Sequence, residues 1–189
     1  MGEVTERWVF GYGSLMWQPG FPFLERRRAA CYGRRRAFCI YSVHHRGTPA
    51  RKGLVLGLAQ GGSVVGAAYR VAEADWPAVY AYLMEREQPT ETYIEHYSAA
   101  RLDDGRVVRA LTFVSDRGHP QWAGDLSLDS QADLIAGATG LSGRNVDYLI
   151  DLVDHLRAEG IADHCMERLL VLVLEREATL SPRMDPSIV

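Results

Sequence analysis

Short runs of β-forming residues dominate the first two-thirds of the chain. Six runs share a high content of β-branched and aromatic residues and end at turn residues: 8–12, 37–42, 54–59, 64–71, 96–102 and 107–114. The Gly61-Gly62 pair between two of these runs predicts a hairpin. We therefore expect a sheet built from this part of the chain.

Hydrophobic residues recur with the helical period in four further segments. One helix is expected over residues 76–87, and three more over 132–137, 145–158 and 163–177, with Asp129-Ser130 as the cap before the second. Strands followed by helices in this order predict an α+β fold, with a small mixed, barrel-like sheet flanked by helices.

Length and composition favour a single domain. A chain of 189 residues that is 47% hydrophobic can bury one sizeable core. We expect one domain over 1–189, with a core at about 7–178 and a loose tail from Ser181. No run approaches the length of a membrane span, and three cysteines without paired spacing suggest reduced thiols, so a cytoplasmic location is expected. The oligomeric state is not predicted.

The distribution of charge gives little reason to expect nucleic acid or a membrane as a partner. The formal net charge is -3, although arginines cluster at 26–28 and 34–36. Such short basic runs are usually a solvated face, and a local anion site is the alternative. A nucleic-acid binder would interleave several aromatic residues with these arginines, whereas only Tyr32 lies between the two runs, which disfavours this function.

The glycine-rich segment 11–16, GYGSLM, is the first candidate for a ligand-binding loop. It follows an apolar strand, and its glycines let the backbone turn sharply and present amide groups. A tight turn without function is the alternative. The loop has neither the third glycine of a dinucleotide fingerprint nor the lysine of a P-loop, which disfavours a nucleotide.

Glu87 is the candidate catalytic base. Val79, Leu83 and Glu87 are spaced four residues apart and share one helix face, whereas Glu85 points to solvent. Burial at the edge of an apolar face raises a carboxyl pKa, so that the group can accept a proton from an amine. The alternative is a glutamate that reaches water or pairs with an arginine.

The histidines and cysteines do not suggest a metal centre. Asp151, Asp154 and His155 share a helix face, but it is opposite the apolar stripe and is expected to be surface. No HExxH, paired CxxC or nucleophile-elbow motif occurs in the sequence. We therefore expect no metal and no cofactor.

Five segments in order resemble the ChaC family of glutathione-specific γ-glutamylcyclotransferases: WVFGYGSLMW at 8–17, HRGTP at 45–49, GAAYR at 66–70, YLMERE at 82–87 and SGRNVDYL at 142–149. The resemblance implies a barrel-like α+β fold and an enzyme that cyclises the γ-glutamyl group of glutathione to 5-oxoproline and releases Cys-Gly. It implies no cofactor, and it assigns the acid/base role to Glu87.

The resemblance also implies a set of substrate contacts: Gly11, Tyr12, Gly13, Ser14, Leu15 and Met16 of the loop, with Arg46, Tyr93 and Tyr148. A segment that closes over the substrate would have to move, and 88–92 is a candidate on position alone. Two alternatives remain: a cyclotransferase for other γ-glutamyl amino acids or amines, and a non-catalytic regulatory or binding protein of the same fold.

Overall fold

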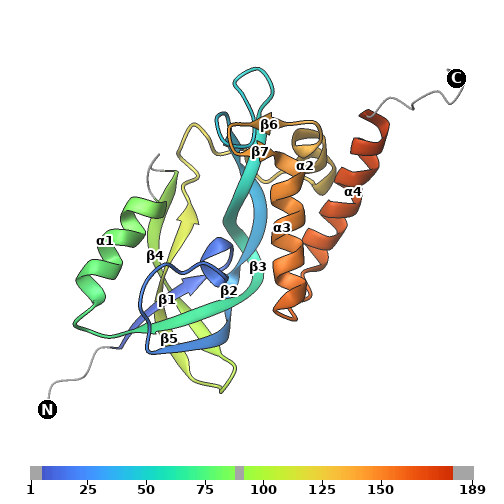
Figure 1. Ribbon diagram of the computed structural model, residues 1–189. Coiled ribbons are helices and arrows are strands. Elements are labelled where there is room, and N and C mark those ends of the chain that lie inside the picture. The colour runs from blue at the N-terminus through green and yellow to red at the C-terminus, as the bar shows by residue number, and fades with distance from the viewer. Residues whose placement is uncertain (1–5, 88–91, 181–189) are drawn as a thin grey trace, which may run out of the picture. The chain divides into compact units, whose positions relative to one another are not determined.

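Five strands close into a barrel within residues 6–87 and 92–180, the part of the chain that the computed structural model describes. Their bounds are β1 (Arg7–Gly11), β2 (Glu25–Ser42), β3 (Gly53–Val71), β4 (Tyr93–Leu102) and β5 (Val107–Ser115). The order around the barrel is β1-β3-β2-β4-β5, and β1 closes it by pairing parallel to β5 (Figure 1). The predicted α+β class with a mixed, barrel-like sheet is confirmed.

β1 is a buried strand of the closed barrel, because Trp8, Val9 and Phe10 are at most 1% exposed. It pairs antiparallel with β3 from Arg7↔Val71 to Gly11↔Ala67, and parallel with β5 at Trp8 and Val9. A strand that is buried on both faces has consecutive apolar residues instead of an alternation with polar ones, which explains the sequence WVF at 8–10. The core therefore holds the strand that leads into the glycine-rich loop.

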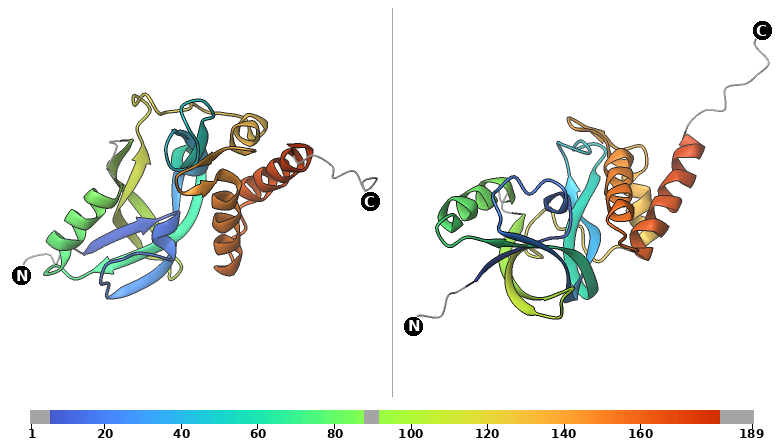
Figure 2. Two further views of the ribbon diagram at one scale, coloured as in Figure 1. Left: turned by 45° about the horizontal axis from the view of Figure 1, so that its top comes forward. Right: turned by 60° about the horizontal axis from the view of Figure 1, so that its bottom comes forward.

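Helix α1 (Trp76–Glu87) lies along the outside of the barrel next to β4, as both views in Figure 2 show. Val79 and Leu83 are buried at its inner face, and the Tyr80 hydroxyl donates to Glu95 of β4 at 2.6 Å. The predicted helix bounds are confirmed. The end of α1, where Glu87 lies, is thus fixed against the barrel.

β2 and β3 are much longer than predicted. Each is one continuous bent strand, and the predicted hairpin at Gly61-Gly62 is wrong. Gly33, Gly61 and Gly62 have φ angles of 76°, 87° and 73°, which other residues adopt only with strain. Positive φ at these positions bends the strands without ending them, as at a bulge.

The chain divides into two compact units. The first runs to Ile40 and resumes over Leu56–Gly124; the second comprises Tyr41–Val55 and the chain from Asp125 on. The expectation of a single domain over 1–189 stays a prediction.

The second unit is mainly helical. Its elements are α2 (Leu128–Ile135), β6 (Thr139–Gly140), β7 (Gly143–Arg144), α3 (Asn145–Ala158) and α4 (His164–Leu180). α3 has the predicted bounds, whereas α2 starts earlier than predicted, because the Ser127 side chain accepts from the Ser130 amide and caps it. Asn145 is fully buried, and its amide bonds both the N–H and the carbonyl of Leu54, at 2.7 and 2.8 Å.

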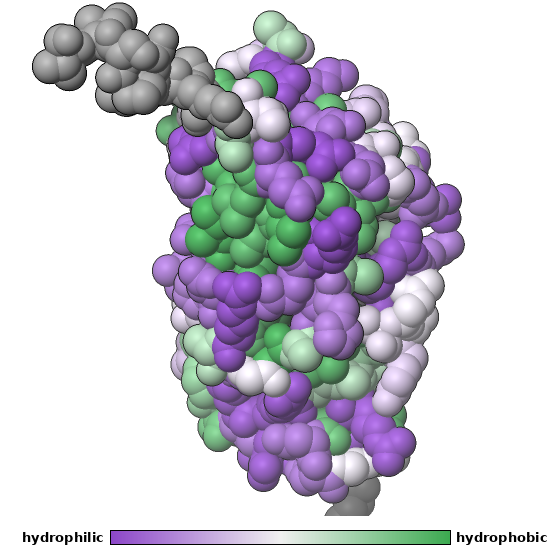
Figure 3. Space-filling view, turned by 90° about the vertical axis from the view of Figure 1, so that its right-hand side faces the viewer, coloured by the Kyte–Doolittle hydropathy of each residue, from purple (hydrophilic) through white to green (hydrophobic). Residues whose placement is uncertain are grey.

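The outer face of α4 keeps apolar side chains in contact with solvent. Val171 and Leu174, which are spaced three residues apart, are 45% and 46% exposed. Figure 3 shows the apolar surface on this side of the molecule. The buried face of α4 is formed by Met166, Leu169 and Val173.

Some predictions fall outside the described residues. These are the loose tail from residue 181 and all of the proposed mobile segment except Thr92, which is buried. Among the described residues, no helix is long and apolar enough to cross a membrane. The same residues contain no group of three or more His, Cys, Asp or Glu side chains that could hold a metal ion.

Candidate active site

The glycine-rich loop turns directly after β1 into the 3-10 helix η1 (Ser14–Met16). Tyr12, Leu15 and Met16 point into the core and are at most 8% exposed, whereas Ser14 is exposed. The Met16 amide donates to the Gly13 carbonyl at 2.9 Å and closes the turn. The loop therefore offers a ligand its backbone around Gly13 and the Ser14 hydroxyl rather than its larger side chains.

The turn brings Leu15 so close to the backbone of residue 11 that only glycine fits there. A Cβ at Gly11 would lie 2.8 Å from the Leu15 Cβ, well inside van der Waals contact. Gly66 on β3 is similarly restricted, because its Cβ would lie 2.2 Å from the Gly11 carbonyl oxygen. These two glycines let β3, β1 and the loop approach one another closely.

Two side chains hold the carbonyl groups of the loop. Arg36, only 4% exposed, donates to the Tyr12 carbonyl at 2.6 Å. The hydroxyl of buried Tyr69 lies 2.9 Å from the Leu15 carbonyl and 2.7 Å from that of Met16. Because C=O and N–H of a trans peptide point in opposite directions, the Gly13 amide points away from Arg36. The loop backbone is thus fixed before any ligand binds.

Glu87 lies at the end of the apolar face of α1, as predicted. Its side chain is 19% exposed, and Leu83 one turn earlier is fully buried. Glu85 is exposed, which confirms the prediction that the two glutamates face different environments. Glu87 is therefore a partly dehydrated carboxyl group next to solvent.

Arg86 connects Glu87 to the loop. Its Nε lies 3.2 Å from Glu87 Oε1, and its Nη2 donates to Ser14 Oγ at 3.0 Å. Its Nη1 donates to the Gln18 carbonyl at 2.6 Å and to the Tyr82 hydroxyl at 2.8 Å. One guanidinium group therefore contacts both the candidate base and the candidate binding loop.

The electrostatic environment suits Glu87 to proton transfer. Burial raises the pKa of its carboxyl group above the ordinary value, while the Arg86 charge and hydrogen bond act in the opposite direction. Burial is the larger effect, so the net shift is upward. A raised carboxyl pKa brings the group closer to neutral pH, where a general base works best.

Tyr93, a predicted substrate contact, lies close to the loop. Its hydroxyl donates to the Leu56 carbonyl at 2.6 Å. The Leu56 side chain in turn lies against Gly13, where an added Cβ would be 3.1 Å from Leu56 Cδ2. Tyr93 and the loop thus contact the same residue of β3, and Tyr93 itself is half-buried at the start of β4.

The other two predicted contacts, Arg46 and Tyr148, belong to the second unit. The Arg46 guanidinium lies over the Tyr148 ring, 5.2 Å from its centroid, and donates to the Arg144 carbonyl at 3.2 Å. The two residues, about 100 positions apart in the sequence, therefore lie together. Their role in binding a substrate stays a prediction.

Sequence reasoning missed the residues that hold the site in place. Arg36 belongs to the basic run 34–36, which was interpreted mainly as a solvated face. For Arg36 this interpretation is wrong, because its side chain is buried. Tyr69 and Arg86 lie inside the recognised motifs, but the pattern alone assigned them no partner. Nothing in the spacing of polar residues predicts that a guanidinium on α1 would reach the loop.

The sequence and structure match known proteins. A family model described as ChaC-like protein matches residues 7–176. The Escherichia coli glutathione-specific gamma-glutamylcyclotransferase is 39% identical over 166 residues, which span 88% of this chain and 72% of that protein. Human glutathione-specific gamma-glutamylcyclotransferase 1 is 28% identical over 98% of this chain and 85% of its own. The chain belongs to the ChaC-like family.

A solved structure has the same fold. The crystal structure of a glutathione-specific gamma-glutamyl cyclotransferase from yeast superposes with a TM-score of 0.81, covering 93% of this chain and 98% of that one. The two sequences are 24% identical, so this likeness supports the fold rather than particular residues. It agrees with the barrel-like α+β architecture expected from the sequence.

Proposed function

We propose that the protein is a γ-glutamylcyclotransferase that cleaves glutathione to 5-oxoproline and Cys-Gly, with Glu87 as general base and then general acid. The observation that carries the proposal is that one guanidinium, that of Arg86, contacts both the partly dehydrated carboxyl group of Glu87 and the Ser14 hydroxyl of the loop. Membership of the ChaC-like family supports the same activity, because several relatives are named as enzymes of this reaction.

The reaction needs only proton transfer and orientation. The α-amine of the γ-glutamyl residue attacks its own γ-carbonyl carbon, a C–N bond forms in a five-membered ring, and the amide bond to cysteine breaks. Glu87 accepts the proton that the amine releases and returns it to the departing amine of Cys-Gly. Since amine and carbonyl belong to one residue, closure benefits from a high effective concentration once the conformer is fixed.

The loop fixes that conformer and holds the γ-glutamyl end of the substrate. Its carbonyl groups are occupied by Arg36 and Tyr69, so the backbone at Gly13 and Ser14 is preorganised. Backbone N–H groups at such a turn are suited to a carboxylate or to the oxyanion that develops on the γ-carbonyl. Preorganised donors stabilise this charge without rearranging during the reaction.

Glutathione is the proposed substrate, rather than γ-glutamyl amino acids in general. The Escherichia coli, human and Schizosaccharomyces pombe relatives all carry the name glutathione-specific. Tyr93, Arg46 and Tyr148 are proposed as further contacts to the substrate. We place the enzyme in the cytoplasm, where thiols stay reduced. Cys31, Cys39 and Cys165 all lie in the described part of the chain, and none of them forms a disulfide there.

Product analysis tests this function. Purified protein is incubated with reduced glutathione in buffer without added metal or nucleotide, and 5-oxoproline and Cys-Gly are measured by mass spectrometry. A parallel panel contains γ-glutamyl amino acids and a γ-glutamylamine. Equal release of both products from glutathione alone is the expected result. Release from the panel at similar rates would contradict glutathione specificity, and no 5-oxoproline from any substrate would contradict the enzymatic function.

A further inference from the structure

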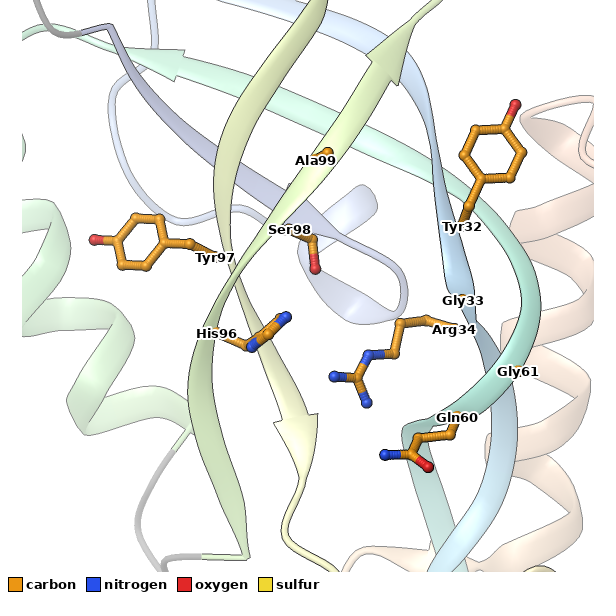
Figure 4. A pocket seen from close by; sticks show the side chains of 9 residues that line it. All are labelled: Tyr32, Gly33, Arg34, Gln60, Gly61, His96, Tyr97, Ser98 and Ala99. Carbon is orange, nitrogen blue, oxygen red and sulfur yellow. The ribbon is translucent and has the colours of Figure 1, made fainter.

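A pocket of about 580 Å³ opens in the barrel wall where β2 and β4 stop pairing (Figure 4). The ladder between these strands joins residues 29–31 to residues 100–102. The pocket begins directly beyond this ladder and is lined by 32–34 of β2, 96–99 of β4, and Gln60 and Gly61 of β3. No residue proposed for the glutathione site lies among its nine lining residues, so this is a separate cavity.

The pocket is positively charged. The guanidinium of Arg34 points across the gap toward His96 in Figure 4, and within residues 6–87 and 92–180 it has no hydrogen bond or ion pair. Burial, and secondly the Arg34 charge, lower the pKa of the His96 ring. None of the nine lining residues is acidic. An arginine that has no counter-ion among the described residues, in a pocket lined by polar groups, is a feature of anion sites.

Further hydrogen-bond donors face the same space. The Gln60 side chain is fixed because its Oε1 accepts from Arg117 at 2.8 Å, which leaves its amide nitrogen to face the pocket. The Gln60 carbonyl accepts from Arg35, so a second guanidinium lies behind this wall. The Ser98 hydroxyl points into the gap from β4. These groups supply neutral donors beside the Arg34 charge.

The geometry argues against a peptide strand as the occupant. An added strand needs a flat, extended edge with regular backbone donors and acceptors. Here Gly33 on β2 and Gly61 on β3 have positive φ angles of 76° and 87°, so the backbone around the gap is bent. The volume is within the range of small-molecule pockets, which is about 300–1,000 Å³.

We propose that this pocket binds a small oxyanion, the phosphate or carboxylate group of a metabolite, at a site separate from the cyclotransferase centre. Arg34 supplies the charge and two parallel N–H donors, the geometry that suits a planar carboxylate or a phosphate. Gln60, Ser98 and His96 complete the contacts. The bound anion serves as the counter-ion of Arg34, since the described part of the protein provides none.

Calorimetry with two anions tests the proposal and distinguishes the two chemistries. Sodium phosphate and sodium succinate are titrated separately into the full-length protein at pH 7, with sodium chloride at equal ionic strength as the reference. The variants are Arg34→Gln and, as a matched control, Arg168→Gln, which removes an exposed arginine of α4. Circular dichroism verifies that each variant is folded.

We expect saturable binding of at least one of the two anions to the wild type and to Arg168→Gln, weakened on the order of tenfold to a hundredfold in Arg34→Gln. The stronger ligand identifies phosphate or carboxylate chemistry. Absence of binding above the chloride reference would overturn the proposal. So would equal affinity of the wild type and the Arg34→Gln variant.

The His96 ring provides a local readout by NMR. The charged side chain that points toward it is that of Arg34 from β2, whereas the Tyr32 and Tyr97 side chains point away from it in Figure 4. Arg35 and Arg117 contact Gln60. A bound anion should shift the His96 resonance and raise its pKa in the wild type, but not in Arg34→Gln. Resonance shifts confined to the Gly11–Met16 loop would instead place the anion at the cyclotransferase centre and overturn the separate site.

Discussion

Replacing Arg86 should change both the ionisation of Glu87 and the position of the loop. In the wild type, burial raises the pKa of Glu87, and the charge and hydrogen bond of Arg86 lower it. Arg86→Gln removes both lowering effects, so the pKa of Glu87 should rise further. Because the base works in its ionised form, the acidic limb of the kcat/KM profile should move to higher pH.

The expected size of the effect follows from the contacts of Arg86. The guanidinium is 22% exposed and donates to Ser14, Gln18 and Tyr82 while pairing with Glu87. Hydrogen bonds to a charged group contribute about 1.5–3 kcal/mol each, and partners such as Ser14 that can reach water lose less. We expect Arg86→Gln to lower the free energy of unfolding by about 2–3 kcal/mol.

The comparison of two variants separates charge from position. Arg86→Lys keeps a positive charge near Glu87 but cannot reproduce the planar set of donors. It should restore the acidic limb toward its wild-type pH while kcat stays reduced, because the loop is still displaced. Arg168→Gln serves as the control for loss of an exposed arginine. An acidic limb unchanged in Arg86→Gln would refute the electrostatic link between Arg86 and Glu87.

Three further predictions concern packing and thiol reactivity. Gly11→Ala should lose about 1–3 kcal/mol in chemical denaturation together with turnover, because its Cβ overlaps the following turn. Gly118→Ala should be tolerated, because its Cβ would meet only Asp116 Oδ1, at an ordinary contact distance of 3.4 Å; equal tolerance of the two variants would contradict the close packing. Tyr69→Phe removes the buried hydroxyl that bonds the Leu15 and Met16 carbonyls, of which Met16 keeps only the longer bond from Arg26 at 3.3 Å. It should lower stability by about 1–3 kcal/mol, and an unchanged denaturation midpoint would argue against this role. Burial raises the pKa of the Cys31 thiol to about 12, and Cys165 is the exposed cysteine. In the native protein one thiol, that of Cys165, should therefore react rapidly with a disulfide-exchange reagent, and a second rapidly reacting thiol would contradict the structure.

The sequence predicted helices better than strands. The bounds of α1 and α3 were correct because their apolar residues recur with the helical period. β2 was predicted from residue 37, but it starts at Glu25, because arginines on its exposed face concealed the alternation of buried Ala29 and Cys31. Pairing with neighbouring strands, rather than local preference, extends this strand.

The candidate site was predicted in part. The position of Glu87 on a buried face follows from its spacing to Leu83, and the motif placed the loop after β1. The connection through Arg86 depends on contacts between residues about 70 positions apart, which periodicity does not contain. The bent path of β3 through Gly61 also escaped prediction, since paired glycines favour a hairpin more often than a bend within a strand.

Glu87→Gln should leave the protein folded. Burial raises the folded-state pKa of Glu87 above its unfolded value, so the stability that its neutral form contributes is present at low pH and is lost as pH rises through the folded-state pKa. A neutral glutamine avoids burying this charge at pH 7. Thermal denaturation should therefore give a midpoint at least as high as that of the wild type.

The most direct test of the central claim is the rate of 5-oxoproline formation from glutathione by Glu87→Gln beside Glu85→Gln. Both variants remove one carboxylate from the same helix end, but only Glu87 lies on the buried face. The account predicts that Glu87→Gln loses turnover by at least about a hundredfold, within the range for a removed acid/base group, while Glu85→Gln stays near wild type. Wild-type turnover by a folded Glu87→Gln protein would contradict it.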